Sequence, residues 1–292
     1  NAAAEGHIVA IQGLTRDKKE LLKIHELKLS LLRSRDAVST LNAGKEALIL
    51  ARLRPPSRRG GNRSAIKRLS RRYIAQKNLK VLQDPDQEKA ILQNILMHLA
   101  LPAREKNQPY LGWIIVSILE LAEKTGHADP SAFALSLLGP LLLEAGGMPE
   151  QAVSLADRAL QLARERNATA VISRVLYIRA MFVSHHRGHV AATLEEFQEG
   201  LVLARQSGDL YFLGRNAHGR ALSGLCNLSL RLGRVRSLME ESEVSVHRAG
   251  EADLKESFDL SWQFYFNLVG VSRNKSRLSG DRFLEENSLN LW

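Results

Sequence analysis

Leu203-Ala204-Arg205-Gln206-Ser207-Gly208 closes a helix-like stretch of this chain, and two earlier stretches close in nearly the same way. The earlier copies are Leu121-Ala122-Glu123-Lys124-Thr125-Gly126 and Leu162-Ala163-Arg164-Glu165-Arg166-Asn167, each 41 residues before the next. Glycine, and less often asparagine, tolerates the left-handed conformation that ends an α-helix. The repetition therefore predicts a series of helices, each ended by a turn, with a period that holds two helices.

Further breaks of the same kind divide the chain at nearly constant spacing. They are Gly126, Gly147, Asn167, Gly188, Gly208, Gly233 and Gly250, separated by 21, 20, 21, 20, 25 and 17 residues. Two helices per ~41 residues is typical of solenoids of the tetratricopeptide kind. We therefore predict an all-α, tetratricopeptide-like right-handed α-solenoid of antiparallel helix pairs, with about eleven helices and a concave face for partner contact.

The 25-residue interval between Gly208 and Gly233 predicts one helix that is about a turn longer than the others. Three glycines lie inside this interval, at positions 214, 219 and 224. Either they allow close approach of neighbouring helices or they mark a weak helix, and the sequence leaves both interpretations open.

Apolar residues at i, i+3, i+4, i+7, i+8 and i+11 predict the buried face of a helix after Gly147. These residues are Ala152, Leu155, Ala156, Ala159, Leu160 and Ala163. Asp129-Pro130 predicts a helix start with aspartate as the cap, and Pro140 predicts a kink in that helix. The turn-rich stretches divide the chain into an N-terminal helix pair (1–54), a basic connecting segment with a helix (55–86), the main repeat array (87–270) and a polar, basic C-terminal segment (271–292).

The net charge of +10 comes from one segment. Between Ala47 and Gln83 there are eleven lysines and arginines and no acidic residue, so the rest of the chain is close to neutral. The candidate partner-binding residues in this segment are Arg58, Arg59, Arg63, Lys67, Arg68, Arg71, Arg72, Lys77 and Lys80. The favoured interpretation is a solvated basic helix that packs through Ile66, Leu69, Tyr73 and Ile74. The alternatives are an acidic protein partner or neighbouring domain, and phosphate groups of nucleic acid or membrane.

Other residue types give no pattern that predicts catalysis. Glycines 60 and 61 lack the spacing and the lysine of a phosphate-binding loop, and neither a nucleophile elbow nor a protein-kinase signature is present. We interpret the three histidines at positions 185, 186 and 189 as a solvated turn rather than a metal site, and the adjacent glutamate pairs as exposed helix faces. Cys226, the single cysteine, lies among leucines and predicts a buried, inert thiol. We expect no catalytic residues, no cofactor and no metal.

The apolar stretches and the start of the chain bear on its cellular compartment. No stretch approaches the ~18 uninterrupted apolar residues of a membrane span, and the start lacks the pattern of a secretory signal. Because no initiator methionine is present, we interpret the chain as a piece of a longer protein and expect it to be cytoplasmic.

Several short stretches resemble the helical region that follows the nucleotide-binding domain in large multidomain predicted ATPases of bacterial and fungal signalling proteins. The stretches are the block from Gln83 to Leu92, Ser131-Ala132-Phe133-Ala134, Met181-Phe182-Val183-Ser184-His185 and Gly208-Asp209-Leu210. Before them, Ser34-Arg35-Asp36-Ala37-Val38 followed by Gly44-Lys45-Glu46-Ala47-Leu48 resembles a tetratricopeptide-type turn and second helix. Proteins of this type join a serine/threonine-kinase-like domain, an ATPase domain, the helical region and a sensor histidine kinase. The resemblance covers most of the span from Lys23 to Gly270, and it implies that any ATPase or kinase chemistry lies outside this chain.

The resemblance and the repeats together predict a non-catalytic scaffold for protein–protein or interdomain interaction and signal relay within a larger ATPase-linked signalling protein. The alternative is the helical-repeat region of a nucleic-acid-associated, ATP-dependent transcription regulator. We favour a protein partner, or neighbouring domains of the same chain, over nucleic acid.

Overall fold

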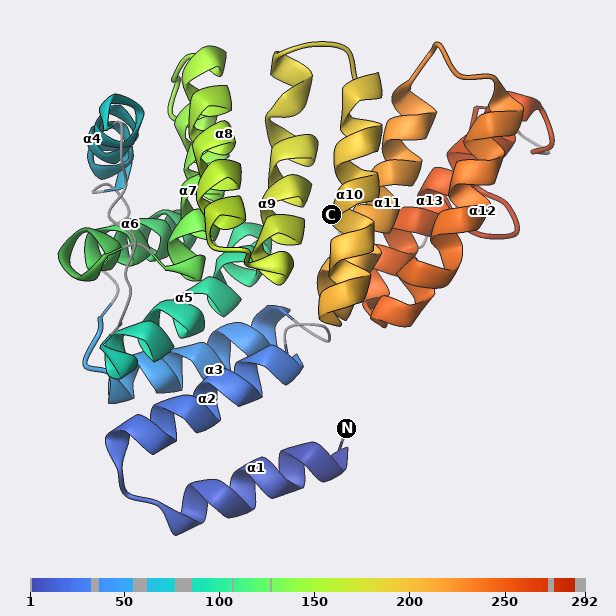
Figure 1. Cartoon of the computed structure of the whole chain (residues 1–292). Helices are drawn as coiled ribbons and strands as arrows, with labels where there is room; N and C mark the ends of the chain where they lie inside the picture. Colours follow the sequence, from blue (N-terminus) through green and yellow to red (C-terminus); the bar gives the residue numbers. More distant parts are fainter. Residues whose placement is uncertain are drawn as a thin grey trace. The chain divides into compact units, whose positions relative to one another are not determined.

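The computed structural model describes residues 2–32, 37–54, 62–76, 86–106, 108–126, 128–272 and 276–286. Within these ranges the chain forms thirteen α-helices and one 3-10 helix, and its only β-structure is an isolated bridge between Ser279 and Leu284 (Figure 1). The all-α prediction is confirmed, with more helices than the eleven expected. The chain divides into two compact units, residues 1–175 and residues 176–292, and each is described separately. No described helix is both long enough and apolar enough to cross a bilayer.

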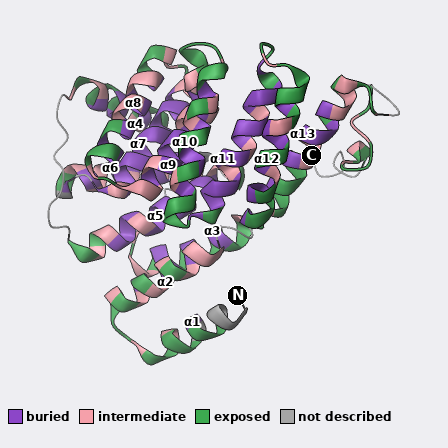
Figure 2. Ribbon diagram, turned by 45° about the vertical axis from the view of Figure 1, so that its right-hand side comes forward, coloured by how far each residue is buried: buried purple, intermediate pink, exposed green. Residues whose placement is uncertain are grey.

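The N-terminal unit contains α1 to α8 and the first half of α9. The helices are α1 (Ala2–Leu14), α2 (Lys18–Leu32), α3 (Ala37–Leu50), α4 (Asn62–Ala75), α5 (Gln87–Lys106), α6 (Gln108–Thr125), α7 (Asp129–Glu144), α8 (Pro149–Glu165) and α9 (Thr169–Phe182). α5 packs on both α2 and α3, and α7 packs on both α5 and α6. α1 contacts α2 and is mostly exposed (Figure 2).

Helix α8 shows why these helices pack as they do. All six apolar residues of its predicted stripe are buried, from Ala152 to Ala163, so the predicted face is confirmed. The helix starts at Pro149, since proline has no N–H to leave unpaired in the first turn. The neighbouring α7 starts at Asp129 as predicted, but its cap is Ala128, whose N–H donates to Ser131 Oγ at 2.8 Å. Asp129 instead accepts from Arg166 Nε at 2.5 Å.

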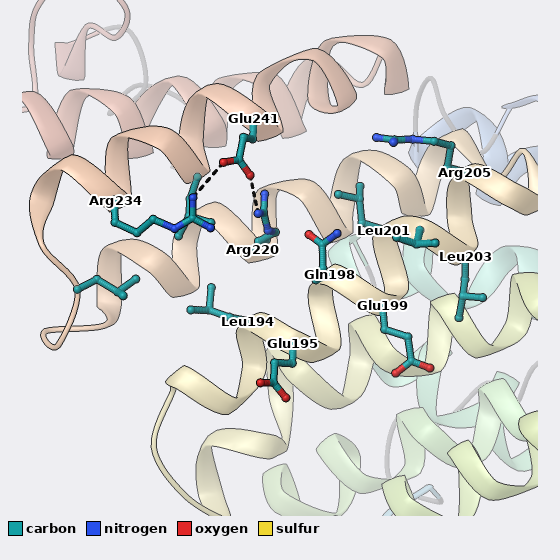
Figure 3. A pocket seen from close by; sticks show the side chains of 13 residues that line it. Leu194, Glu195, Gln198, Glu199, Leu201, Leu203, Arg205, Arg220, Arg234 and Glu241 are labelled. Atoms are coloured by element: carbon teal, nitrogen blue, oxygen red, sulfur yellow. Dashed lines mark hydrogen bonds and ion pairs between the residues drawn. The ribbon is translucent and has the colours of Figure 1, made fainter.

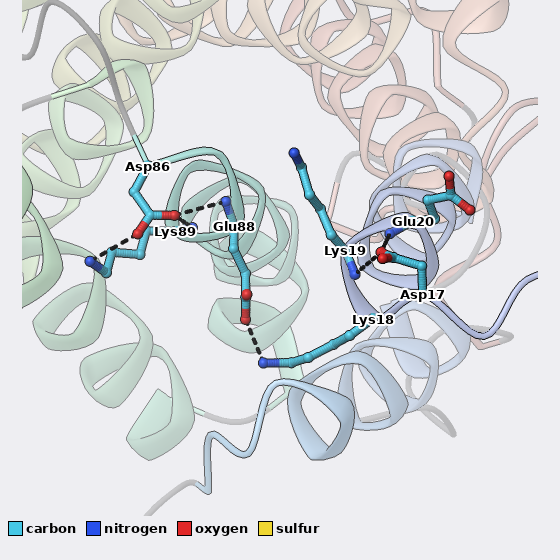
Figure 4. A network of polar contacts seen from close by, with 7 residues as sticks. All are labelled: Asp17, Lys18, Lys19, Glu20, Asp86, Glu88 and Lys89. Carbon is cyan, nitrogen blue, oxygen red and sulfur yellow. Dashed lines mark hydrogen bonds and ion pairs between the residues drawn. The ribbon is translucent and has the colours of Figure 1, made fainter.

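Aspartates cap the first turns of α2 and α5, and the two turns are joined by an ion pair (Figure 4). Asp17 Oδ1 accepts from the backbone N–H groups of Lys19 and Glu20, at 2.8 and 3.0 Å. Lys18 reaches across to pair with Glu88 of α5. Side-chain capping satisfies backbone donors that a helix cannot pair itself, so these aspartates fix where both helices begin.

The C-terminal unit contains the second half of α9, a 3-10 turn and four α-helices. After α9 come η1 (Ser184–His186), α10 (Ala191–Ser207), α11 (Leu210–Cys226), α12 (Leu232–Ala249) and α13 (Ala252–Val269). α11 is its centre, because it packs against α10, α12 and α13. Its Phe212 lies 5.7 Å from Tyr177 of α9, ring centre to ring centre, and Tyr177 lies 6.3 Å from Phe197 of α10.

The three glycines of α11 occupy points of close approach, which settles the question that the sequence left open. A Cβ added at Gly219 would lie 2.3 Å from the Phe197 ring, and one at Gly214 would lie 2.5 Å from the Ala249 Cβ. At Gly224 the distance to Leu238 would be 2.8 Å. These glycines therefore allow neighbouring helices to approach α11 more closely than any larger residue permits.

The predicted helix breaks are partly confirmed. Gly126, Asn167, Gly208 and Gly250 have positive φ and follow the ends of helices. At the Gly147 break the left-handed residue is Gly146, with φ of 78°. The break predicted at Gly233 is wrong, since Gly233 is the second residue of α12.

The long helix predicted between Gly208 and Gly233 is also wrong. α11 has 17 residues, the same as α10, and the extra residues form the turn from Asn227 to Arg231. This turn follows Cys226, whose predicted burial is a further error because its side chain is exposed. Cys226 is the last residue of α11, and its side chain points outward between the buried Leu225 and Asn227.

We predict that Gly219→Ala lowers the free energy of unfolding by about 1–3 kcal/mol, because the Phe197 ring must move out of a filled core. The matched control is Gly233→Ala, where an added Cβ meets nothing within 4 Å. That change should be neutral or stabilise by less than about 1 kcal/mol, since alanine favours helix over glycine. Urea unfolding of both variants measures the difference, and equal midpoints would contradict the close packing of α10 on α11.

Candidate functional site

The basic segment predicted as a partner-binding site contains helix α4, which packs on α6, α7 and α8. Ile66, Leu69 and Tyr73 are buried and Ile74 is half-buried, so the predicted packing face is confirmed. Burial raises the pKa of the Tyr73 hydroxyl, as expected for a phenol enclosed by apolar side chains. Four of the candidate residues, Arg58, Arg59, Lys77 and Lys80, lie outside the described residues.

The five remaining candidates, all exposed on α4, fall into two groups. Arg68 pairs with Glu120 and Arg72 with Glu123, each at 2.8 Å, and both glutamates belong to α6. These two arginines therefore help to hold α4 against α6. Arg63, Lys67 and Arg71 form no ion pair with any described residue, and they leave a row of three cations exposed to solvent.

We predict that the chain binds duplex DNA only weakly, because two of the four cations that would face phosphate are already paired with glutamates. Each phosphate contact would contribute about −0.9 to the slope of log affinity against log salt concentration. Anisotropy titrations over a salt series should compare the wild type with a variant in which Lys67, Arg68, Arg71 and Arg72 are all changed to Gln. Submicromolar binding at physiological ionic strength that this variant abolishes would instead support the nucleic-acid alternative.

The other side chains singled out in the sequence lie in exposed or paired positions. His185 and His186 form the exposed η1 turn, and burial followed by the charge of His186 lowers the pKa of His185. No group of three or more His, Cys, Asp or Glu side chains in the described residues is arranged to hold a metal ion. Glu195 is exposed whereas its neighbour Glu196 accepts from Arg179 at 2.6 Å, so the two carboxylates diverge as predicted.

The structure contains a groove that sequence reasoning missed. It has a volume of about 750 Å³ and lies between α10 and α12, with α11 beneath it (Figure 3). Its apolar lining consists of Leu194, Leu201, Val202, Leu203, Leu230 and Leu238. Val202 keeps 41% of its surface exposed, so the groove offers apolar area to a ligand.

The charged lining of the groove has a fixed centre. Arg220 Nη2 donates to Glu241 Oε2 at 2.6 Å, and Arg234 Nη1 donates to Glu241 Oε1 at 3.1 Å (Figure 3). The hydrogen bond from Arg220 lowers the pKa of the Glu241 carboxyl, with smaller effects from the charges of both arginines. Arg220 is buried, whereas Arg234 is about half exposed, so of these two arginines a ligand can reach Arg234.

Helix α10 lines the other side of the groove and carries charges of both signs. Helix α10 contributes Glu195, Gln198 and Glu199, and its far end carries Arg205. The groove is therefore lined by two glutamates and Arg205 on α10, and by two arginines around Glu241 on α11 and α12. Such a surface can hold both charged and apolar side chains of a ligand in fixed positions.

His218 lies on α11 against α13. Its Nε2 is 3.3 Å from Ser261 Oγ, and its ring centre is 6.0 Å from that of Phe258. Burial, with a smaller effect from Arg215, lowers the pKa of His218 to about 4. Arg215 is itself paired with Glu251 at 2.8 Å, so its charge is partly balanced. His218 is therefore neutral in the folded protein at neutral pH.

We predict that this histidine makes the C-terminal unit sensitive to acid. An unfolded histidine has a pKa of about 6.5, so the unfolded state takes up the proton first as pH falls. The stability that neutral His218 contributes is present above pH 6.5 and is lost as pH falls towards 4. Between pH 7 and 5 the loss should be about 2 kcal/mol. Between pH 7 and 5 the melting temperature should fall less for His218→Gln than for the wild type. His247→Gln, which changes an exposed histidine, should show the same fall as the wild type. Equal drops in all three proteins would refute the assignment.

No family model, no curated protein and no solved structure matches this chain. The resemblance to the helical region of multidomain signalling ATPases therefore stays a prediction. What the structure adds is the groove, which depends on the spacing of α10 and α12 and has no signature in local sequence.

Proposed function

We propose that this chain is a non-catalytic, tetratricopeptide-like scaffold that binds a peptide segment of a protein partner in the groove between α10 and α12. The observation that carries the proposal is the groove itself, with its apolar lining, in which Val202 is exposed, and its arginines held by Glu241. The sequence resemblance adds the larger setting, a cytoplasmic ATPase-linked signalling protein in which the scaffold relays a signal between domains.

The packing within each unit supports a repeat of helix pairs. In the N-terminal unit α5 contacts both helices of the pair before it, and α7 does the same. In the C-terminal unit α13 contacts both α11 and α12. α5, α7, α9, α11 and α13 begin at residues 87, 129, 169, 210 and 252, in steps of 40 to 42 residues. Helix pairs that contact mainly their neighbours form the extended binding surfaces of solenoid proteins.

The lining of the groove favours a peptide over a small metabolite. The floor and rim combine six apolar side chains with charged groups of both signs, as in interfaces that have an apolar centre and a polar rim. Arginine is enriched among residues that dominate binding energy, and Arg234 is exposed beside the apolar floor. Because Glu241 already accepts from two arginines, it serves to orient them rather than to move protons.

We predict that peptides selected on the wild-type chain lose at least tenfold in affinity when Val202 is changed to Glu. The change places a carboxylate in the apolar lining that α10 contributes to the groove, three residues from Glu199. The matched control is Val244→Glu on α12, where valine is 73% exposed and outside the groove. Peptides from a displayed random library, measured afterwards by fluorescence anisotropy, provide the probe.

The control variant decides whether the groove is the binding site. Val244→Glu should leave the affinity within about twofold of the wild type, since it adds the same charge to the same unit. Failure to select any peptide, or equal losses in the two variants, would remove the groove as the binding site. The nucleic-acid alternative rests on α4 and is decided separately by the salt series.

A further inference from the structure

Residues 276–286 return to the surface of α12 and α13 and place one arginine side chain there. The Arg282 guanidinium lies 4.8 Å from the ring centre of Trp262. Its Nη1 donates to Glu243 Oε1 at 2.6 Å and lies 3.8 Å from Asp259 Oδ1. One cation is thus held by an aromatic face and two carboxylates from two helices.

These three side chains form a built site for a guanidinium, which we call the arginine cage. Trp262 is buried, and the side chains of Glu243 and Asp259 are 23% and 20% exposed. A planar guanidinium can stack on an indole and pair with carboxylates at its edge at the same time, which an ammonium group does less well. Lys255 and His247 also lie near Asp259, so the cage is not simply an excess of negative charge.

The backbone of the segment presents Arg282 in a tight turn. Gly280 N–H donates to the Phe283 carbonyl at 2.8 Å, and the bridge between Ser279 and Leu284 flanks the turn. A hydrogen bond from Asn267 Nδ2 to the Arg277 carbonyl, 2.8 Å long, attaches the segment at its start. Asp281 and Leu284 are exposed, and Arg282 itself remains 33% exposed. Arg282 is therefore the side chain that joins the turn to the cage.

We propose that the arginine cage is a binding site for an arginine presented by a partner protein, and that Arg282 occupies it from within the chain. Glu243, Asp259 and Trp262 belong to helices of the folded unit, whereas Arg282 lies in the turn of residues 276–286. An arginine-bearing turn of a partner makes the same stack and the same ion pairs. Occupation by a tethered group reduces the apparent affinity for a competitor by the fraction of time that the cage is filled.

The test uses the 11-residue peptide with the sequence of residues 276–286, labelled with a fluorophore, and the full chain. The Arg282→Ala chain should bind this peptide at least tenfold more tightly than the wild-type chain does, because its cage is empty. A peptide that carries the Arg282→Ala change should not bind the Arg282→Ala chain. Similar affinity of the peptide for both chains, or equal binding of both peptides, would overturn the proposal.

Three control chains show whether the peptide binds at the cage itself. The Arg277→Ala chain lacks a neighbouring arginine, whose ion pair among the described residues is with Glu286 at 3.5 Å. This chain should bind the peptide as weakly as the wild-type chain does. Asp259→Asn added to Arg282→Ala should abolish the tenfold gain, and persistence of the gain would contradict the cage. Val202→Glu added to Arg282→Ala should leave peptide binding unchanged. The proposal for the cage is therefore tested independently of the proposal for the groove.

Discussion

The close approach of α11 to its three neighbours is the constraint on which the C-terminal unit depends. An added Cβ would come within 3 Å of α10 at Gly219, of α12 and α13 at Gly214, and of α12 at Gly224. Because α11 sits so near α10 and α12, its Arg220 can reach Glu241 at the base of the groove. Dispersion forces fall off steeply with distance. A displacement of α11 by about the size of a methyl group would therefore weaken the core, and it would also change the shape of the groove.

The sequence predicted what depends on neighbours along one helix. The apolar stripe from Ala152 to Ala163 follows from the 3.6-residue period, and all of it is buried. The same reasoning placed Ile66, Leu69 and Tyr73 on the packing face of α4. It misplaced the break at Gly233, because glycine also occurs in the first turn of a helix, where its cost is small. Whether a glycine ends a helix depends on φ, which composition does not determine.

The contacts that build the candidate sites could not be predicted, because they join residues far apart in the sequence. Arg68 and Glu120 are separated by 52 residues, and Arg282 and Glu243 by 39. Local patterns gave the charge of α4 but not the fact that α6 neutralises two of its arginines. The groove is harder still to predict, since it requires the distance between α10 and α12, which depends on the packing of both helices on α11.

Helix α12 separates the groove from the arginine cage. Glu241 faces Arg220 and Arg234 in the groove, whereas Glu243 faces Arg282. Residues two apart are rotated by about 200° around the helix axis, so the two side chains lie on nearly opposite sides of α12. Neither glutamate can therefore pair with the arginines of the other site, and a ligand can bind in one site while the other is also occupied. A movement of α12 as a body would couple the two sites. Leu238 packs against α11 at Gly224, where an added Cβ would lie 2.8 Å from the Leu238 Cδ1, and this contact resists such a movement.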